Sequence, residues 1–171
     1  MEGVDTPSWP RLVFADALAK YDVQPTLHTI ELINAACTLL DTDLETPNVL
    51  ALASLPVTGE VNSFVMTDRV AAVRHDLDLP ALSSDETEIR AAQAMSRHWQ
   101  NGGISDRELS SWAHTTISHS GAAALQELVM YDDILDNLPV FGMNDQTAHE
   151  NLIQIVETIL NLPDPWAPSD S

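Results

Sequence analysis

The sequence predicts an all-α protein, a single-domain bundle of about seven or eight helices with a central αα-hairpin. Apolar residues recur at the three- and four-residue steps of an α-helix along most of the chain. Several of these segments begin at a residue type that caps helices. The strand-like segments 55–59 and 140–143 are too short, or too interrupted by glycine, to build a sheet.

The composition describes an acidic protein with enough apolar residues for a core. Of 171 residues, 44% are hydrophobic, and 26 acidic side chains against 7 basic ones give a net charge of −19. Such an excess of negative charge disfavours binding to nucleic acid, because contacts to phosphates need a basic protein surface. It disfavours binding to anionic membranes for the same reason. The single cysteine, Cys37, excludes an internal disulfide. With no secretory signal and no apolar run of about 20 residues, we expect a cytoplasmic protein.

The first half of the chain contains several helix start signals. Pro10 is tolerated in a first turn, and Thr46 followed by Pro47 is typical of an N-cap with proline at the first helical position. Pro80 ends the apolar stripe before it. We therefore expect helices at residues 9–21, 25–40, 47–55 and 61–77.

The second half contains the clearest start and stop signals. Ser105, three residues before Glu108, makes a capping box, and Gly121 lies where a left-handed C-terminal cap would end the same helix. A second helix follows to Asp136, so the two form the predicted hairpin. The flanking helices are expected to begin at Ser83 or Asp85 and at residue 144 or 145. These predictions divide the chain into a flexible N-terminus at 1–8, one helical domain at 9–162, and a proline-rich disordered tail at 163–171.

Two short segments carry a resemblance to a known group of proteins. The run Glu45-Thr46-Pro47, leading to residues 52–55, is similar to a pattern in small, uncharacterised actinobacterial helical proteins. So is the later order of an Ala91-Ala92 helix, a Gly-Gly pair, an acid-capped helix and a tryptophan at 112. The resemblance covers roughly residues 46–136, and it implies a helical fold and an actinobacterial, hence bacterial, origin.

The end of the second hairpin helix carries an unusual acidic cluster. Asp132 and Asp136 share the helix face of Leu125 and Val129, and Asp133 flanks them. Acidic residues near a helix C-terminus oppose the helix dipole, and a carboxylate turned toward a core needs a partner. The cluster is therefore a candidate functional site, and a positive group is expected there.

One candidate for that positive group is a divalent metal ion, Mg²⁺ or Mn²⁺. Its ligands would be Asp132, Asp133 and Asp136 with His114 or His119. The two histidines are five residues apart and point about 140° from each other on a helix, so both can join only if the helix ends before His119. The string from 132 to 136 also resembles the first aspartate-rich motif of isoprenyl diphosphate synthases, which implies bound Mg²⁺. The second acidic motif of that family is missing.

The other candidate is an arginine. Arg90 and Arg97 lie two turns apart on the helix predicted before the hairpin, and either could pair with Asp132 or Asp136. This structural ion pair is the main alternative to a metal.

Two hypotheses about function remain. The first, which the charge favours, is a non-enzymatic interaction or inhibitor-type module for a basic protein partner, with no catalytic residue and no cofactor. The second is a metal-dependent enzyme that acts on a phosphorylated substrate through Asp132, Asp133 and Asp136.

Overall fold

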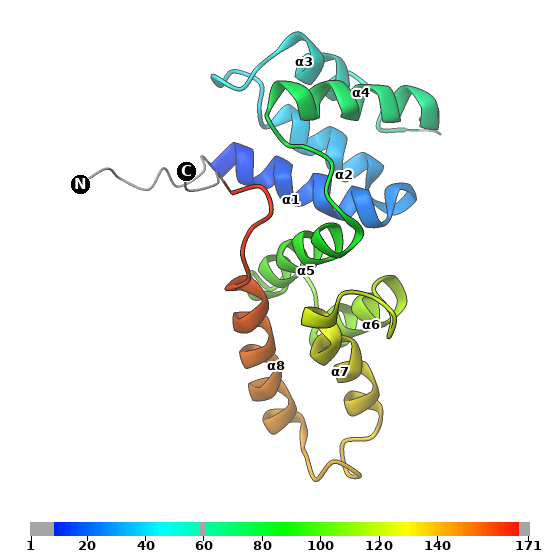
Figure 1. Cartoon of the computed structure of the whole chain (residues 1–171), viewed down its shortest axis with the longest axis vertical. Coiled ribbons are helices and arrows are strands. Elements are labelled where there is room, and N and C mark those ends of the chain that lie inside the picture. Colours follow the sequence, from blue (N-terminus) through cyan, green and yellow to red (C-terminus); the bar gives the residue numbers. More distant parts are fainter. Residues whose placement is uncertain (1–8, 59–60, 168–171) are drawn as a thin grey trace, which may run out of the picture. The chain divides into compact units, whose positions relative to one another are not determined.

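The computed structural model describes residues 9–58 and 61–167, and this part of the chain is helical (Figure 1). It contains eight α-helices and one 3₁₀ turn, with no strand among the described residues. The prediction of an all-α fold is therefore confirmed. None of these helices combines the length and the apolar content that crossing a bilayer requires. The predicted N-terminus, residues 1–8, lies outside the described residues.

The contacts of the chain form two compact units, Met1–Ala81 and Leu82–Ser171. Each unit has its own helices and its own buried side chains. The division of the chain into one domain at 9–162 with two flanking segments stays a prediction.

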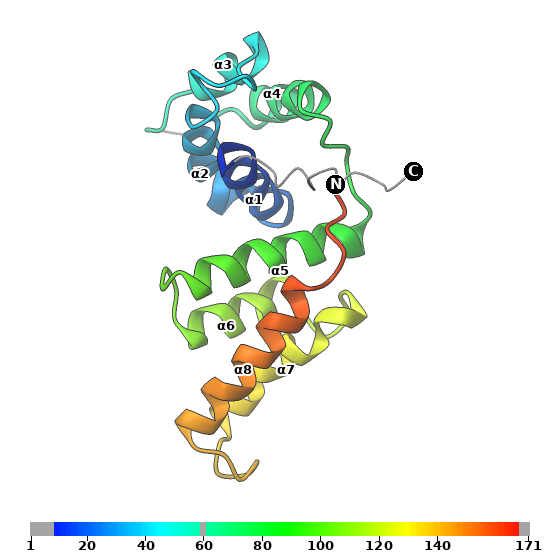
Figure 2. The same cartoon turned by 90° about the vertical axis from the view of Figure 1, so that its left-hand side faces the viewer.

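The first unit is a chain of four helices in which each packs against the next. They are α1 (Trp9–Val23), α2 (Pro25–Cys37), α3 (Pro47–Ala53) and α4 (Ser63–Asp76), and Figure 2 shows them from the side. The predicted start at Pro47 is confirmed, because the Thr46 hydroxyl accepts a hydrogen bond from the Val49 amide. Large apolar side chains from all four helices form its core. They include Phe14, Leu18, Leu32, Ile33, Val49, Leu52, Met66 and Val73.

Buried charges in the first unit are paired. Lys20, the only lysine, is 5% exposed and forms an ion pair with Glu31, which also accepts from His28 Nδ1 at 2.8 Å. Arg74 pairs in the same way with Asp22. Burial raises the pKa of Glu31, but the hydrogen bonds from His28 and Lys20 outweigh it and lower that pKa from 4.5 to about 2.

The second unit is built around one long helix. This helix, α5 (Ser84–Gln100), packs against α6 (Asp106–Thr116), the 3₁₀ turn η1 (Ala123–Leu125) and α8 (Asp145–Leu160). The fourth helix of this unit, α7 (Gln126–Asp136), packs against both α6 and α8. The core side chains come from all four helices and from η1. They include Leu109, Ala113, Leu125, Leu128, Val129, Tyr131, Leu152 and Val156.

The helix starts in this unit agree with the sequence, but one helix end does not. Capping boxes at Ser83 and Ser105 are both present. However, α6 ends at Thr116, and the left-handed residue is Ser118, with φ of 60°, rather than Gly121. A Cβ atom on Gly121 would lie 2.5 Å from the Ile117 carbonyl oxygen, so glycine is needed there for a close approach of the backbone.

The segment after α8 is held against α5. Arg90 is 1% exposed, its Nε lies 3.2 Å from Asp164 Oδ1, and its guanidinium carbon lies 5.3 Å from the centre of the Trp166 ring. Gln93 Nε2 donates to the Leu162 carbonyl at 2.9 Å. Contacts with α5 thus continue beyond residue 162 as far as Trp166, inside the segment 163–171 that the sequence predicts to be a disordered tail.

The Glu31 ion pairs predict a pH-dependent contribution to stability. Because folding lowers the pKa of Glu31, its contribution is fully present above pH 4.5 and is lost as the pH falls toward 2. Glu31→Gln should therefore lower the free energy of unfolding at pH 7, and the gap from wild type should narrow over that range. Urea unfolding at several pH values measures this gap. Glu157→Gln, at an exposed carboxylate, should show no such change, and a gap for Glu31→Gln that stays constant would contradict the assignment.

The Arg90–Trp166 contact predicts a difference between two tryptophans. Trp166→Ala removes the indole ring that lies over the buried guanidinium of Arg90. It should lower the free energy of unfolding by about 1–2 kcal/mol. The matched control is Trp9→Ala, because Trp9 is 71% exposed, and it should change stability by less than about 0.5 kcal/mol. Chemical denaturation followed by circular dichroism compares the two, and equal effects would rule out a structural role for Trp166.

Candidate functional site

Four side chains from the second unit form the His–Asp cluster: His114, His119, Asp132 and Asp133. The end of α6 determines that the two histidines meet. On a continued helix they would diverge, but α6 stops at Thr116 and the chain turns at the left-handed Ser118. The ring centres of His114 and His119 consequently lie 5.0 Å apart, in an edge-to-face arrangement. The helix thus ends before His119, which is the condition that the sequence sets for both histidines to join one site.

The carboxylates of α7 face these two rings. His119 Nε2 lies 3.8 Å from Asp133 Oδ2, and His114 Nδ1 lies 4.0 Å from Asp133 Oδ1. His114 Nδ1 also lies 3.7 Å from Asp132 Oδ2. These distances are longer than hydrogen bonds. The cluster therefore brings together four of the five residues that the sequence proposed as metal ligands.

The fifth residue, Asp136, and the second oxygen of Asp132 have a different partner. Arg107 Nη1 lies 2.7 Å from Asp136 Oδ1 and 3.3 Å from Asp132 Oδ1. The buried Ser110 hydroxyl donates to the same Asp132 oxygen at 2.8 Å. An arginine does meet these carboxylates, which is one of the two possibilities that the sequence leaves open. The residue is Arg107 in the first turn of α6, in place of the predicted Arg90 or Arg97, and Arg90 pairs instead with Asp164.

Arg107 and Ser110 are not among the predicted site residues, although the sequence contains a signal for them. Arg107, Ser110 and His114 follow one another at steps of three and four residues, so they form one stripe along α6. The contacts above show that this stripe faces the carboxylates of α7. A polar stripe opposite an acidic stripe in a predicted hairpin indicates such a pairing.

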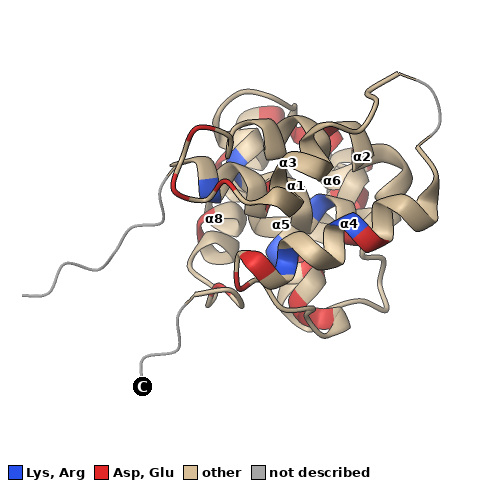
Figure 3. Ribbon diagram, turned by 90° about the horizontal axis from the view of Figure 1, so that it is seen from above, with Lys and Arg blue, Asp and Glu red and all other residues tan. Residues whose placement is uncertain are grey.

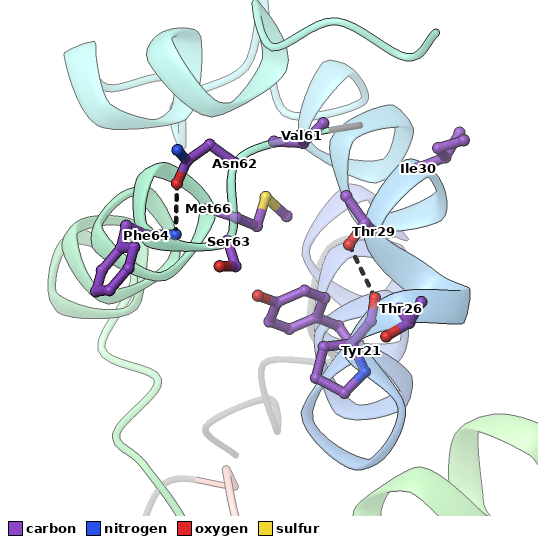
Figure 4. Close-up of a pocket in the computed structure, with 10 residues that line it drawn as sticks. Tyr21, Thr26, Thr29, Ile30, Val61, Asn62, Ser63, Phe64 and Met66 are labelled. Carbon is purple, nitrogen blue, oxygen red and sulfur yellow. Dashed lines mark hydrogen bonds between the residues drawn. The ribbon is translucent and has the colours of Figure 1, made fainter. Parts of the chain in front are cut away.

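A second candidate site is a hollow in the first unit, of about 800 Å³, which we call the α2–α4 hollow (Figure 4). Among the described residues, its lining comes from the end of α1, the first turns of α2, and the start of α4 with the two residues before it. None of these residues is charged. Tyr21, Ser63 and Met66 point toward one another across it. Phe64 and Ile30 lie at its edge, 82% and 49% exposed. An exposed apolar edge around a hollow is typical of a binding surface.

Comparison with known proteins adds no family to this description. No family model matches the chain, and neither a curated protein nor a solved structure matches it. The similarity to actinobacterial helical proteins stays a prediction. What the two sites can bind therefore has to follow from their own chemistry.

The contacts of Asp132 predict how two neighbouring acids differ. Asp132 is 17% exposed and accepts from a buried hydroxyl and a guanidinium, whereas Asp136 is 62% exposed. In a buffer with chelator, Asp132→Asn should lower the free energy of unfolding by about 1–3 kcal/mol, because it weakens hydrogen bonds to a charged acceptor. Asp136→Asn removes a surface ion pair, which contributes about 0–1 kcal/mol. Urea denaturation of both variants tests this, and a larger loss for Asp136→Asn would be inconsistent with these contacts.

Proposed function

We propose that the protein is a non-enzymatic, cytoplasmic interaction module that binds a basic, amphipathic segment of a partner protein in the α2–α4 hollow. The single observation that carries this proposal is an apolar-edged hollow in a strongly acidic chain, with no charged side chain among its described lining residues. Apolar side chains of the partner would enter the hollow, and its basic side chains would meet the carboxylates around it.

The charge of the chain supports a basic partner. Residues 9–81 contain ten acidic and four basic side chains, and residues 82–171 contain fourteen and three. Figure 3 shows this excess of Asp and Glu over Lys and Arg along the helices. A surface of one sign raises the association rate of an oppositely charged partner and repels others.

The contacts of the basic side chains in the first unit strengthen this argument. Lys20 and Arg74 are paired with Glu31 and Asp22. Arg11 donates to the Leu77 carbonyl at 3.0 Å. Two of the four cations of this unit are thus offset by carboxylates and a third is held in a hydrogen bond, while Arg69 is exposed on α4. The ten carboxylates of residues 9–81 still outnumber these cations.

The surface next to the hollow combines apolar and acidic groups. Asp68 follows Phe64 by four residues on α4, so the two side chains lie on the same helix face. Leu27 on α2 is 70% exposed, one turn before Ile30 at the edge of the hollow. An amphipathic segment can bury apolar side chains against Phe64 and Ile30 while a basic side chain reaches Asp68.

The second candidate, a metal-dependent enzyme acting on a phosphorylated substrate, has one specific observation in its favour, the His–Asp cluster. A phosphate group needs cations around it. Within the described residues, Arg107 is the guanidinium that contacts this cluster, and it already bridges Asp132 and Asp136. Binding of an ion therefore has more support than catalysis on a phosphorylated substrate.

The proposal predicts a partner that depends on both salt and Phe64. In a pull-down from a lysate of the source organism, wild-type protein should recover a basic protein at low salt. Recovery should fall as salt rises, because exposed charges are screened beyond about 10 Å at 0.1 M. Phe64→Ser should reduce the affinity by about tenfold, since one well-placed aromatic side chain contributes more than about 1 kcal/mol.

The matched control is Phe141→Ser, because Phe141 is 51% exposed and lies in the other unit. This variant should recover the partner as well as wild type does. Equal losses in both variants, an acidic partner, or recovery that does not respond to salt would contradict the proposal.

A further inference from the structure

We infer that His114, His119 and Asp133 form a binding site for a divalent transition-metal ion of the Zn²⁺ class, with Asp132 beside it. The inference concerns the second unit and does not rest on the proposed binding of a basic partner. One candidate ligand atom from each of these three residues lies within 4.8 Å of the other two.

The distances match a site that needs only small side-chain rotations to close. Around a tetrahedral Zn²⁺, with bonds of about 2.0–2.2 Å, neighbouring donor atoms lie roughly 3.3–3.6 Å apart. The observed separations of 3.8 Å from His119 Nε2 and 4.0 Å from His114 Nδ1 to the oxygens of Asp133 are slightly longer. His119 and Asp133 are 57% and 54% exposed, so both side chains can adjust.

A second observation points to a ligand at the same place. The Nδ1 atom of His114 is buried and has no hydrogen-bond partner in the described part of the chain. Buried polar atoms of this kind usually have one, and an atom without one requires a specific reason. Two carboxylates face this nitrogen at 3.7 and 4.0 Å, too far for hydrogen bonds. An ion between them would give the nitrogen and the carboxylates a common partner.

The neighbouring contacts hold one wall of this site. Asp132 Oδ1 accepts from the Ser110 hydroxyl and Arg107, which leaves Oδ2 directed at His114. Such contacts from outside the ligand set orient the groups that face a metal. Asp132 can supply a fourth donor, or a water molecule can take that position.

The donor set selects the class of ion. Imidazole nitrogen suits Zn²⁺ and its neighbours in the first transition series, whereas Mg²⁺ prefers oxygen donors in an octahedral arrangement. Two imidazoles with a carboxylate therefore favour Zn²⁺ or Co²⁺ over Mg²⁺. Asp136 is excluded from the set, because Arg107 holds its carboxylate.

The test is titration of the chelator-treated full chain with Zn²⁺ and Mg²⁺, followed by calorimetry and thermal melting. Zn²⁺ should bind at a ratio of one per chain and raise the melting temperature in a saturable way, because it binds the native state only. Mg²⁺ should do neither at the same concentration. Co²⁺ should give the visible absorption of a tetrahedral ion with nitrogen and oxygen donors.

Variants separate this site from adventitious binding. His119→Ala and Asp133→Asn should each weaken Zn²⁺ binding by more than about 100-fold, since even residues behind the ligands contribute 10–100-fold. The controls are His75→Ala, at a histidine whose side chain is 91% exposed in the other unit, and Asp136→Asn; both should bind as wild type does. Circular dichroism in chelator shows whether each variant is folded.

Three outcomes would overturn the inference: no saturable binding of Zn²⁺, the same affinity in folded His119→Ala as in wild type, or equal binding of Mg²⁺. Loss of Zn²⁺ binding in His119→Ala with unchanged recovery of a basic partner would support the metal site while leaving the proposed function intact.

Discussion

The scarcity of cations is the constraint on which the structure depends. With 26 acidic and 7 basic side chains, this chain can pack a carboxylate inside a unit only where one of a few positive groups or hydrogen-bond donors meets it. Glu31 meets Lys20 and His28, and Asp132 meets Arg107 and Ser110. Asp22 meets Arg74 in the same way, and most of the other carboxylates in the described part of the chain are exposed to water. The folded chain therefore concentrates its positive charge in internal contacts and exposes negative charge.

Features that depend on neighbouring residues could be predicted from the sequence. The starts of α3, α5 and α6 follow from capping residues within one turn, and the structure confirms Thr46, Ser83 and Ser105 in that role. The end of α6 was predicted at Gly121 because glycine is the usual left-handed residue there. Ser118 takes that conformation instead, while the close approach of the Ile117 carbonyl explains why Gly121 has no side chain. A residue's tertiary contacts are not visible in its local pattern.

The candidate sites were harder to predict for the same reason. The residue types identify the aspartates and histidines as candidate ligands, but whether the two histidines converge depends on where α6 ends. The sequence pattern places the partner arginine on α5, at Arg90 or Arg97, whereas Arg107 on α6 takes that place, because tertiary packing decides which helix faces α7. The α2–α4 hollow has no sequence signature, because Tyr21 and Met66 come from helices that are far apart in the chain and lack a shared motif.

The burial of Lys20 limits how the charge of this protein can be regulated. It is the only lysine side chain in the sequence, it is 5% exposed, and Glu31 holds its ammonium group. Acetylation and ubiquitination need an accessible lysine amine, so the folded chain offers these modifications no exposed side-chain target. Its surface charge can still be altered on hydroxyl groups, where phosphorylation would make it more negative. Phosphorylation can therefore make the surface of the folded chain more acidic. Acetylation of a lysine side chain cannot, because the only lysine is buried.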